Sequence, residues 1–197
     1  VANSWKTYPV LQEELRDSCG NVVKKGLRLA QAGALHSIAA HWSVKTSHAL
    51  VVLPTGTGKT EVMIAAALLA SAVRTLVLVP SDALRTQIST KLLSLGILEE
   101  VGVISKDCLR PVVGSLTRSP RSRDDFEALL KANVVVTTTQ MLLKTEVALL
   151  SELLVRHPHL RGILADGAGV CAQAPTLLAG RGVADRVEVS IANFFES

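Results

Sequence analysis

The sequence predicts a single α/β domain built around a parallel β-sheet. A chain of 197 residues suits one domain, because one core of that size buries most of its apolar surface. Short runs rich in Val, Leu and Ile alternate with longer segments of helical periodicity, which is the order of stacked βαβ units. Such runs suit strands that helices cover on both faces.

The expected elements follow one another at spacings that suit right-handed crossovers. The expected strands occupy residues 49–53, 75–79, 110–113, 133–137 and 162–165. The expected helices occupy residues 27–44, 59–72, 81–95, 123–131 and 145–156, the third with Ser81 as a suitable N-cap. Residues 1–26 are polar and partly helical around 11–17, and we expect an N-terminal extension there. The domain proper is expected at 27–197, with 167–197 as a degenerate or poorly ordered tail because small residues and glycine dominate it.

The composition argues against several classes of protein. Hydrophobic residues make up 48% of the chain, but the apolar run 62–70 is only about half the length that crosses a bilayer, so no membrane partner is expected. The N-terminus lacks a basic start followed by an apolar core, which favours a cytoplasmic location. Three widely spaced cysteines fit neither a disulfide framework nor a Cys-x-x-Cys metal site, and we expect reduced thiols.

The balance of charge is mildly basic. A net charge of +4 is compatible with a polyanionic partner and does not establish one. Arginines gather at residues 118–123. A solvated loop and a contact to a nucleic-acid backbone both remain open for this segment.

The strongest local signal is a glycine-rich loop between an expected strand and an expected helix. The loop consists of Pro54, Thr55, Gly56, Thr57, Gly58, Lys59 and Thr60. The two glycines let backbone N–H groups turn inward, and the following helix directs positive potential at a phosphate. Lys59 can reach the β- and γ-phosphates, and the Thr60 hydroxyl can ligate Mg²⁺. The pattern predicts a P-loop NTPase that binds ATP and Mg²⁺ through residues 55–60, although Leu53 replaces the first glycine of the strict motif.

Two segments beside this loop resemble superfamily 2 helicases of the DEAD/DEAH-box-like kind. Residues 27–31 resemble the Leu-Arg-x-x-Gln segment of that family, so the resemblance assigns Arg28 and Gln31 to nucleotide binding. A glutamine amide donates and accepts at once, which matches N6 and N7 of adenine. Without the resemblance, the segment is an amphipathic helix start.

Residues 76–87 resemble motif Ia of the same helicases, in which a strand ends in Val-Pro and the next helix touches the nucleic-acid backbone. The resemblance assigns Pro80, Ser81 and Arg85 to nucleic acid. Hydroxyls and N–H groups at a helix start are natural phosphate ligands. The alternative is that Ser81 only caps the helix, and both roles are compatible.

Residues 134–142 resemble motif Ib, where a strand delivers threonines to the same nucleic-acid-binding face. The resemblance assigns Thr137, Thr138 and Thr139 to nucleic acid, while a plain strand-to-helix cap is the alternative. The four segments keep the family's order from residue 27 to 142. The resemblance therefore implies a RecA-like first motor domain, related to those of restriction-enzyme motor subunits.

Motif II departs from the family. The expected strand 162–165 runs into Asp166, which the resemblance assigns to the Mg²⁺ shell and to catalysis together with Lys59. The family then has a glutamate that positions or deprotonates the attacking water, and this chain has Gly167. Gly169 replaces the histidine of the motif. Residues 186–194 are either a degenerate motif III or an unrelated tail.

The expected function is that of an ATP-binding motor domain of a DEAD/DEAH-box-like helicase or translocase, with little or no turnover in the isolated chain. A second motor domain is expected to be absent from these 197 residues and to be a partner, domain or subunit. DNA or RNA is expected to bind weakly and without sequence preference. A non-catalytic nucleotide-binding regulatory or scaffold module is the alternative, and a P-loop small-molecule kinase with 118–123 as its lid is a further one.

Overall fold

The computed structural model describes residues 7–45, 49–72, 74–120, 123–144, 160–166 and 188–192. The expected helix 145–156 lies outside the described residues, as do Gly167 and Gly169.

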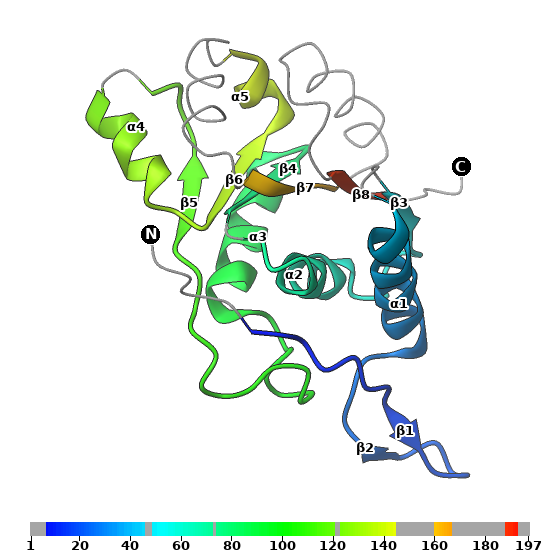
Figure 1. Cartoon of the computed structure of the whole chain (residues 1–197). Helices are drawn as coiled ribbons and strands as arrows, with labels where there is room; N and C mark the ends of the chain where they lie inside the picture. Colours follow the sequence, from blue (N-terminus) through cyan, green and yellow to red (C-terminus); the bar gives the residue numbers. More distant parts are fainter. Residues whose placement is uncertain are drawn as a thin grey trace.

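Six strands form one parallel sheet in the part of the chain that the structure describes, which confirms the predicted α/β class (Figure 1). They are β3 (Ala49–Val52), β4 (Arg74–Val79), β5 (Val113–Leu116), β6 (Val134–Thr138), β7 (Leu160–Asp166) and β8 (Glu188–Ala192). The spatial order is β3-β8-β7-β4-β6-β5, and every neighbouring pair runs parallel. The strand that leads into the glycine-rich loop, β3, is therefore at one edge of the described sheet.

Helices accompany the strands in the alternating order that the sequence predicts. They are α1 (Leu29–Val44), α2 (Lys59–Leu69), α3 (Asp82–Ser94), α4 (Arg123–Leu130) and α5 (Thr139–Lys144). Helices α1, α2 and α3 lie side by side on one side of the sheet (Figure 1). Helix α5 begins directly after β6, earlier than the helix expected from residue 145.

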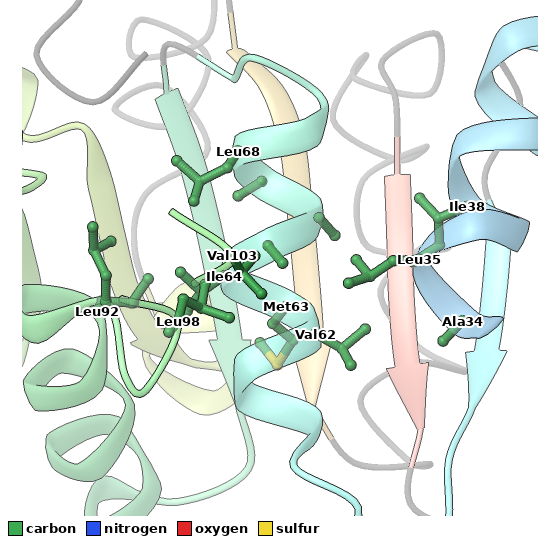
Figure 2. Close-up of a cluster of buried hydrophobic side chains, with 14 of the residues drawn as sticks. Ala34, Leu35, Ile38, Val62, Met63, Ile64, Leu68, Leu92, Leu98 and Val103 are labelled. Carbon is green, nitrogen blue, oxygen red and sulfur yellow. The ribbon is translucent and has the colours of Figure 1, made fainter. Parts of the chain in front are cut away.

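Helix α2 is the centre of the hydrophobic core. Residues 61–68 of this helix are all buried. Figure 2 shows Leu35 and Ile38 of α1 on one flank of α2, and Leu92 of α3 near the other flank. Because apolar burial on two flanks fixes a helix in place, the glycine-rich loop leads into an anchored element.

The edge strand β5 begins at Val113 and not at residue 110, so the predicted boundary is wrong. Pro111 has no N–H to donate to a ladder. Val112 is engaged irregularly, because its N–H donates to the Asn133 side-chain oxygen at 2.9 Å and its carbonyl accepts from the N–H groups of both Asn133 and Val134. Regular pairing of β5 with β6 starts only after these irregular hydrogen bonds, at Val113.

The N-terminal segment forms a hairpin, so the expected helix around 11–17 is wrong. Strands β1 (Leu15–Arg16) and β2 (Val22–Lys24) pair antiparallel. Between them the Asp17 carboxylate accepts hydrogen bonds from the N–H groups of Cys19 and Asn21, a local turn that competes with a helix. The Asn21 side chain contributes most to holding the pKa of Asp17 below its usual value.

The segment before β1 lies against the body of the domain. The Val10 N–H donates to the Val103 carbonyl at 2.7 Å, and Leu11 packs against the core. A methyl group at Gly26 would meet the backbone of Glu13 at 2.5 Å, so the two ends of the hairpin segment approach closely. A division of the chain at residue 27 stays a prediction.

Strand β8 lies within the segment that we expected to be a tail. Residues 188–192 pair with both β3 and β7. Part of the expected tail is therefore a strand of the sheet, while the assignment of residues 186–194 to a degenerate motif III stays a prediction. Cys19 and Cys108 carry free thiols, and burial raises the pKa of Cys108.

Candidate nucleotide and nucleic-acid site

The carboxyl ends of the parallel strands bring the predicted motifs to one edge of the sheet. Strand β3 leads into the glycine-rich loop, β4 into Pro80 and Ser81, and β6 into Thr139. The register aligns their ends, because Asp166 of β7 pairs with Ile191 of β8, which in turn pairs with Val51 of β3. Ligands of open parallel sheets bind at this edge.

Two glycines give the loop the backbone shape of a phosphate cradle. Gly56 has φ +80° and Gly58 has φ +81°, a region that L side chains rarely adopt. Gly58 is also the N-cap of α2. The first hydrogen bond of the helix runs from the Val62 N–H to the Gly58 carbonyl. The N–H groups before Val62 therefore have no acceptor within the helix.

The Pro54 carbonyl at the start of the loop accepts hydrogen bonds from residues at its end. This oxygen accepts from the Thr57 hydroxyl at 2.7 Å and from the Lys59 ammonium at 3.0 Å. The Lys59 side chain therefore lies across the loop, where it is partly exposed. An ammonium beside the N–H groups of a loop and a helix start is a donor set that suits a polyphosphate, and a hydroxyl at Thr60 is a suitable Mg²⁺ ligand. The residues present fit Mg·ATP.

Arg28 and Gln31 lie against this loop. The Arg28 guanidinium donates to the Gly56 carbonyl at 3.1 Å. The Gln31 side-chain nitrogen donates to the Gly58 carbonyl at 3.3 Å, and its oxygen accepts from the Arg28 N–H at 3.0 Å. Gln31 is only 4% exposed. Its amide thus supports the loop in the structure, and the reading of adenine by Gln31 stays a prediction.

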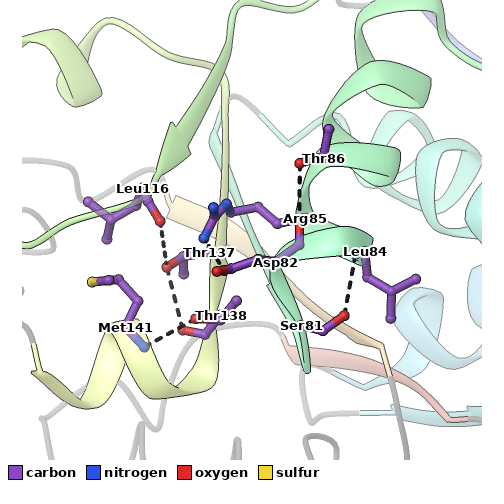
Figure 3. Close-up of polar contacts among 9 residues, drawn as sticks. All are labelled: Ser81, Asp82, Leu84, Arg85, Thr86, Leu116, Thr137, Thr138 and Met141. Atoms are coloured by element: carbon purple, nitrogen blue, oxygen red, sulfur yellow. Dashed lines mark hydrogen bonds and ion pairs between the residues drawn. The ribbon is translucent and has the colours of Figure 1, made fainter.

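The motif Ia segment forms a capped helix start. The Ser81 hydroxyl accepts from the Leu84 N–H at 3.4 Å, so the capping role predicted for Ser81 is present (Figure 3). Pro80 and Ser81 are exposed. Arg85 is less available, because its guanidinium pairs with the Asp82 carboxylate at 2.5 Å and the arginine side chain is 11% exposed. The exposed N–H groups and hydroxyl are therefore better placed for a phosphate than the arginine.

The motif Ib threonines are largely internal. Thr137, Thr138 and Thr139 are all buried. The Thr137 hydroxyl lies within hydrogen-bonding distance of the Leu116 carbonyl, at 3.5 Å, and the Thr138 hydroxyl accepts from the Met141 N–H at 3.2 Å (Figure 3). Thr138 thus caps the turn into α5, which is the alternative left open by the sequence. Nucleic-acid contacts by these residues stay a prediction.

Sequence reasoning missed two features near this edge. An ion pair joins Glu61, directly after the loop, to Lys91 of α3. A cavity of about 300 Å³ opens beside the end of β5. Its lining includes Ser115, Thr117 and the ion pair between Arg118 and Asp125. Neither feature follows from local patterns, since each combines residues from separate elements.

Comparisons with known proteins agree with this geometry. The family model described as "Type III restriction enzyme, res subunit" matches residues 24–163. The chain therefore belongs to that family, and it has the fold of the first RecA-like domain of a superfamily 2 helicase, as the motifs predicted. A search of curated proteins found no match.

Solved helicase and restriction-enzyme structures share the fold. The UvsW helicase from bacteriophage T4 is 16% identical with a TM-score of 0.53, over 91% of this chain and 55% of that one. The DUF1998 helicase MrfA is 19% identical with a TM-score of 0.55, over 81% and 26%. The Type ISP restriction-modification enzyme LlaGI is 16% identical with a TM-score of 0.53, over 86% and 17%. The chain thus spans little more than half of UvsW and far less of the other two proteins.

The sequence predicted no membrane-spanning segment, and the helices of the structure can be compared with that prediction. Among the residues that the structure describes, no helix is both long and apolar enough to span a bilayer.

Proposed function

We propose that this chain is the ATP-binding motor domain of a nucleic-acid helicase or translocase and that it turns ATP over poorly by itself. The supporting observation is the convergence of the glycine-rich loop, Asp166 and the motif Ia helix start at one edge of the parallel sheet. Membership of the res-subunit family supports a helicase-type motor. The DEAD/DEAH-box character and the cytoplasmic location remain part of the proposal.

Different residues in and beside the loop are assigned to the phosphates, the metal ion and the adenine of Mg·ATP. Backbone N–H groups from Thr55 to Thr60 would hold the phosphates, and the ammonium of Lys59, which now donates to the Pro54 carbonyl, would neutralise the β- and γ-phosphates. Thr60 and Asp166 would hold Mg²⁺. The bound ion supplies charge neutralisation on the transferred phosphate. Arg28 and Gln31 fix the loop from outside, with Gln31 favouring adenine.

Hydrolysis requires a group that orients water, and the sequence has Gly167 where the family has glutamate. Phosphoryl transfer by such motors depends on positioning and charge stabilisation, so the absence of that carboxylate lowers turnover more than binding. This asymmetry also describes the alternative function, a regulatory or scaffold module that binds nucleotide without turnover. Stimulation of ATP hydrolysis by nucleic acid would distinguish a motor from such a module.

Nucleic acid is proposed to cross the same edge beside Pro80 and Ser81. Arg85, with its charge shared by Asp82, and the buried threonines 137–139 contribute less directly. A P-loop kinase is the less favoured candidate, because the arginine-rich lid it needs would fall on 118–123, where Arg118 is already paired with Asp125.

Single-stranded DNA or RNA is expected to bind weakly, with an affinity that falls steeply as salt rises. The reason is that contacts to phosphates release counterions, whereas contacts to bases carry the sequence preference. Fluorescence anisotropy with labelled oligonucleotides of several sequences, titrated between about 50 and 200 mM salt, measures both properties. Ser81→Ala should weaken all sequences alike, with Ser94→Ala as the control at the other end of α3. An affinity that does not change with salt, or no binding at the lowest salt, would contradict nucleic-acid binding at this edge of the sheet.

A further inference from the structure

Glu61 is a buried carboxylate beside the phosphate loop. It follows Thr60 directly, in the first turn of α2, and its side chain is 6% exposed. One carboxylate oxygen accepts from the Lys91 ammonium at 2.7 Å. Lys91 lies in the last turn of α3, 30 residues further along the chain. The pair therefore joins the helix that starts at the phosphate loop to the helix that starts at Ser81.

The same carboxylate is packed against the loop backbone. A methyl group built at Gly58 would lie 3.1 Å from the second Glu61 oxygen and 2.3 Å from the Gln31 side-chain nitrogen. At the far side, a methyl group at Gly96, just past the end of α3, would lie 3.4 Å from the first oxygen. Glu61 thus fills the space between Gly58 and the end of α3.

The carboxylate stays in this space because Lys91 neutralises it. A buried carboxylate that loses its partner is strongly destabilised and turns toward water. If Glu61 turned away, Gly58 would lose one of the two side chains that confine it. Glu61 is paired and buried, so it is not free to activate a water molecule in place of the missing motif II glutamate.

We propose that the Glu61–Lys91 ion pair positions the phosphate loop, and that the affinity for Mg·nucleotide depends on it. The inference rests on the proposed nucleotide binding at residues 54–60. The pair acts through Gly58 and not through the ligand. Both side chains are therefore positioning residues, and their effect reaches the ligand through the conformation of the loop.

The test compares three variants with wild type. Lys91→Met removes the charge at similar length, Lys91→Arg keeps it, and Lys106→Met is the matched control at an exposed lysine. Calorimetry with Mg·ADP should show binding weakened about tenfold in Lys91→Met, within the range of coupling between sites, with near wild-type affinity in Lys91→Arg and Lys106→Met. The ¹⁵N amide resonance of Gly58 in the free protein should shift in Lys91→Met alone.

A double variant separates positioning from stability. In Glu61→Gln with Lys91→Met neither charge remains, so the thermal stability lost in Lys91→Met should largely return. Nucleotide affinity should stay low, because the loop still lacks its fixed carboxylate. If Lys91→Met binds Mg·ADP like wild type and the Gly58 resonance does not move, the positioning role is wrong while nucleotide binding stands. If wild type itself does not bind Mg·ADP, the proposed function fails, and this inference fails with it.

Discussion

ATPase activity of the 197-residue chain should be close to background, with or without nucleic acid. Two separate defects lead to this result. Gly167 stands where the family has the glutamate expected to orient the attacking water, and these 197 residues contain no segment that resembles a second motor domain with its arginine finger. Each of the two groups typically contributes several orders of magnitude to phosphoryl transfer, so restoring one alone should rescue little.

The informative variant repairs both defects. Gly167→Glu with Gly169→His, joined to a related second motor domain, should hydrolyse ATP in response to nucleic acid at least about a hundredfold faster than the same fusion with Gly167 retained. A coupled phosphate-release assay measures the rates, and Lys59→Ala in the repaired fusion is the control for a contaminating ATPase. Strong stimulated hydrolysis by the unrepaired chain would show that another residue orients the water.

Gly58→Ala should damage both folding and nucleotide binding. At φ +81° an alanine pays roughly 1–2 kcal/mol for the left-handed conformation. Its methyl group would also lie 2.3 Å from the Gln31 nitrogen, so the hydrogen bonds that Gln31 makes to Arg28 and Gly58 would be disturbed. We expect a total loss of about 2–4 kcal/mol in the free energy of unfolding, and nucleotide binding too weak to measure by calorimetry.

Gly56→Ala is the matched control for this prediction. Gly56 has nearly the same backbone conformation, at φ +80°, but a methyl group there meets nothing within 4 Å. Chemical denaturation should therefore show a loss of about 1–2 kcal/mol for Gly56→Ala, from the backbone strain alone. Equal losses in the two variants would mean that crowding by Gln31 and Glu61 does not matter at Gly58.

The central part of the fold was predictable because local signals agree there. The apolar run before the loop, the glycines at 56 and 58 and the Ala-rich helix after Lys59 each predict the same strand, turn and helix, and the structure has β3 and α2 in those places. The motif Ia strand and helix were equally clear, with Ser81 as the cap. In such segments the local sequence already favours one secondary structure, and tertiary packing buries it without changing it.

The remainder depends on contacts between distant residues. The start of β5 is set by Asn133, which precedes the neighbouring strand β6 and accepts a hydrogen bond from the Val112 N–H, and no local pattern contains that hydrogen bond. The Asp17 turn produces a hairpin where a partly helical segment was expected. The ion pair between Glu61 and Lys91 joins two helices, so neither residue could be assigned a role from its own neighbours. Gln31 and Thr138 use their polar groups inside the protein in this structure, so their roles toward ligands stay predictions.

The most direct test of nucleotide binding is a calorimetric titration of the chain with Mg·ATP beside Lys59→Ala. Lys59 belongs to the loop itself, and its ammonium lies 3.0 Å from the Pro54 carbonyl. Wild type should bind one equivalent, and loss of the ammonium should weaken binding about a hundredfold, as expected for a charge-assisted contact to phosphate. Lys45→Ala, at the exposed end of α1, should bind like wild type. Equal affinity in wild type and Lys59→Ala would contradict the assignment of residues 54–60 as the nucleotide site.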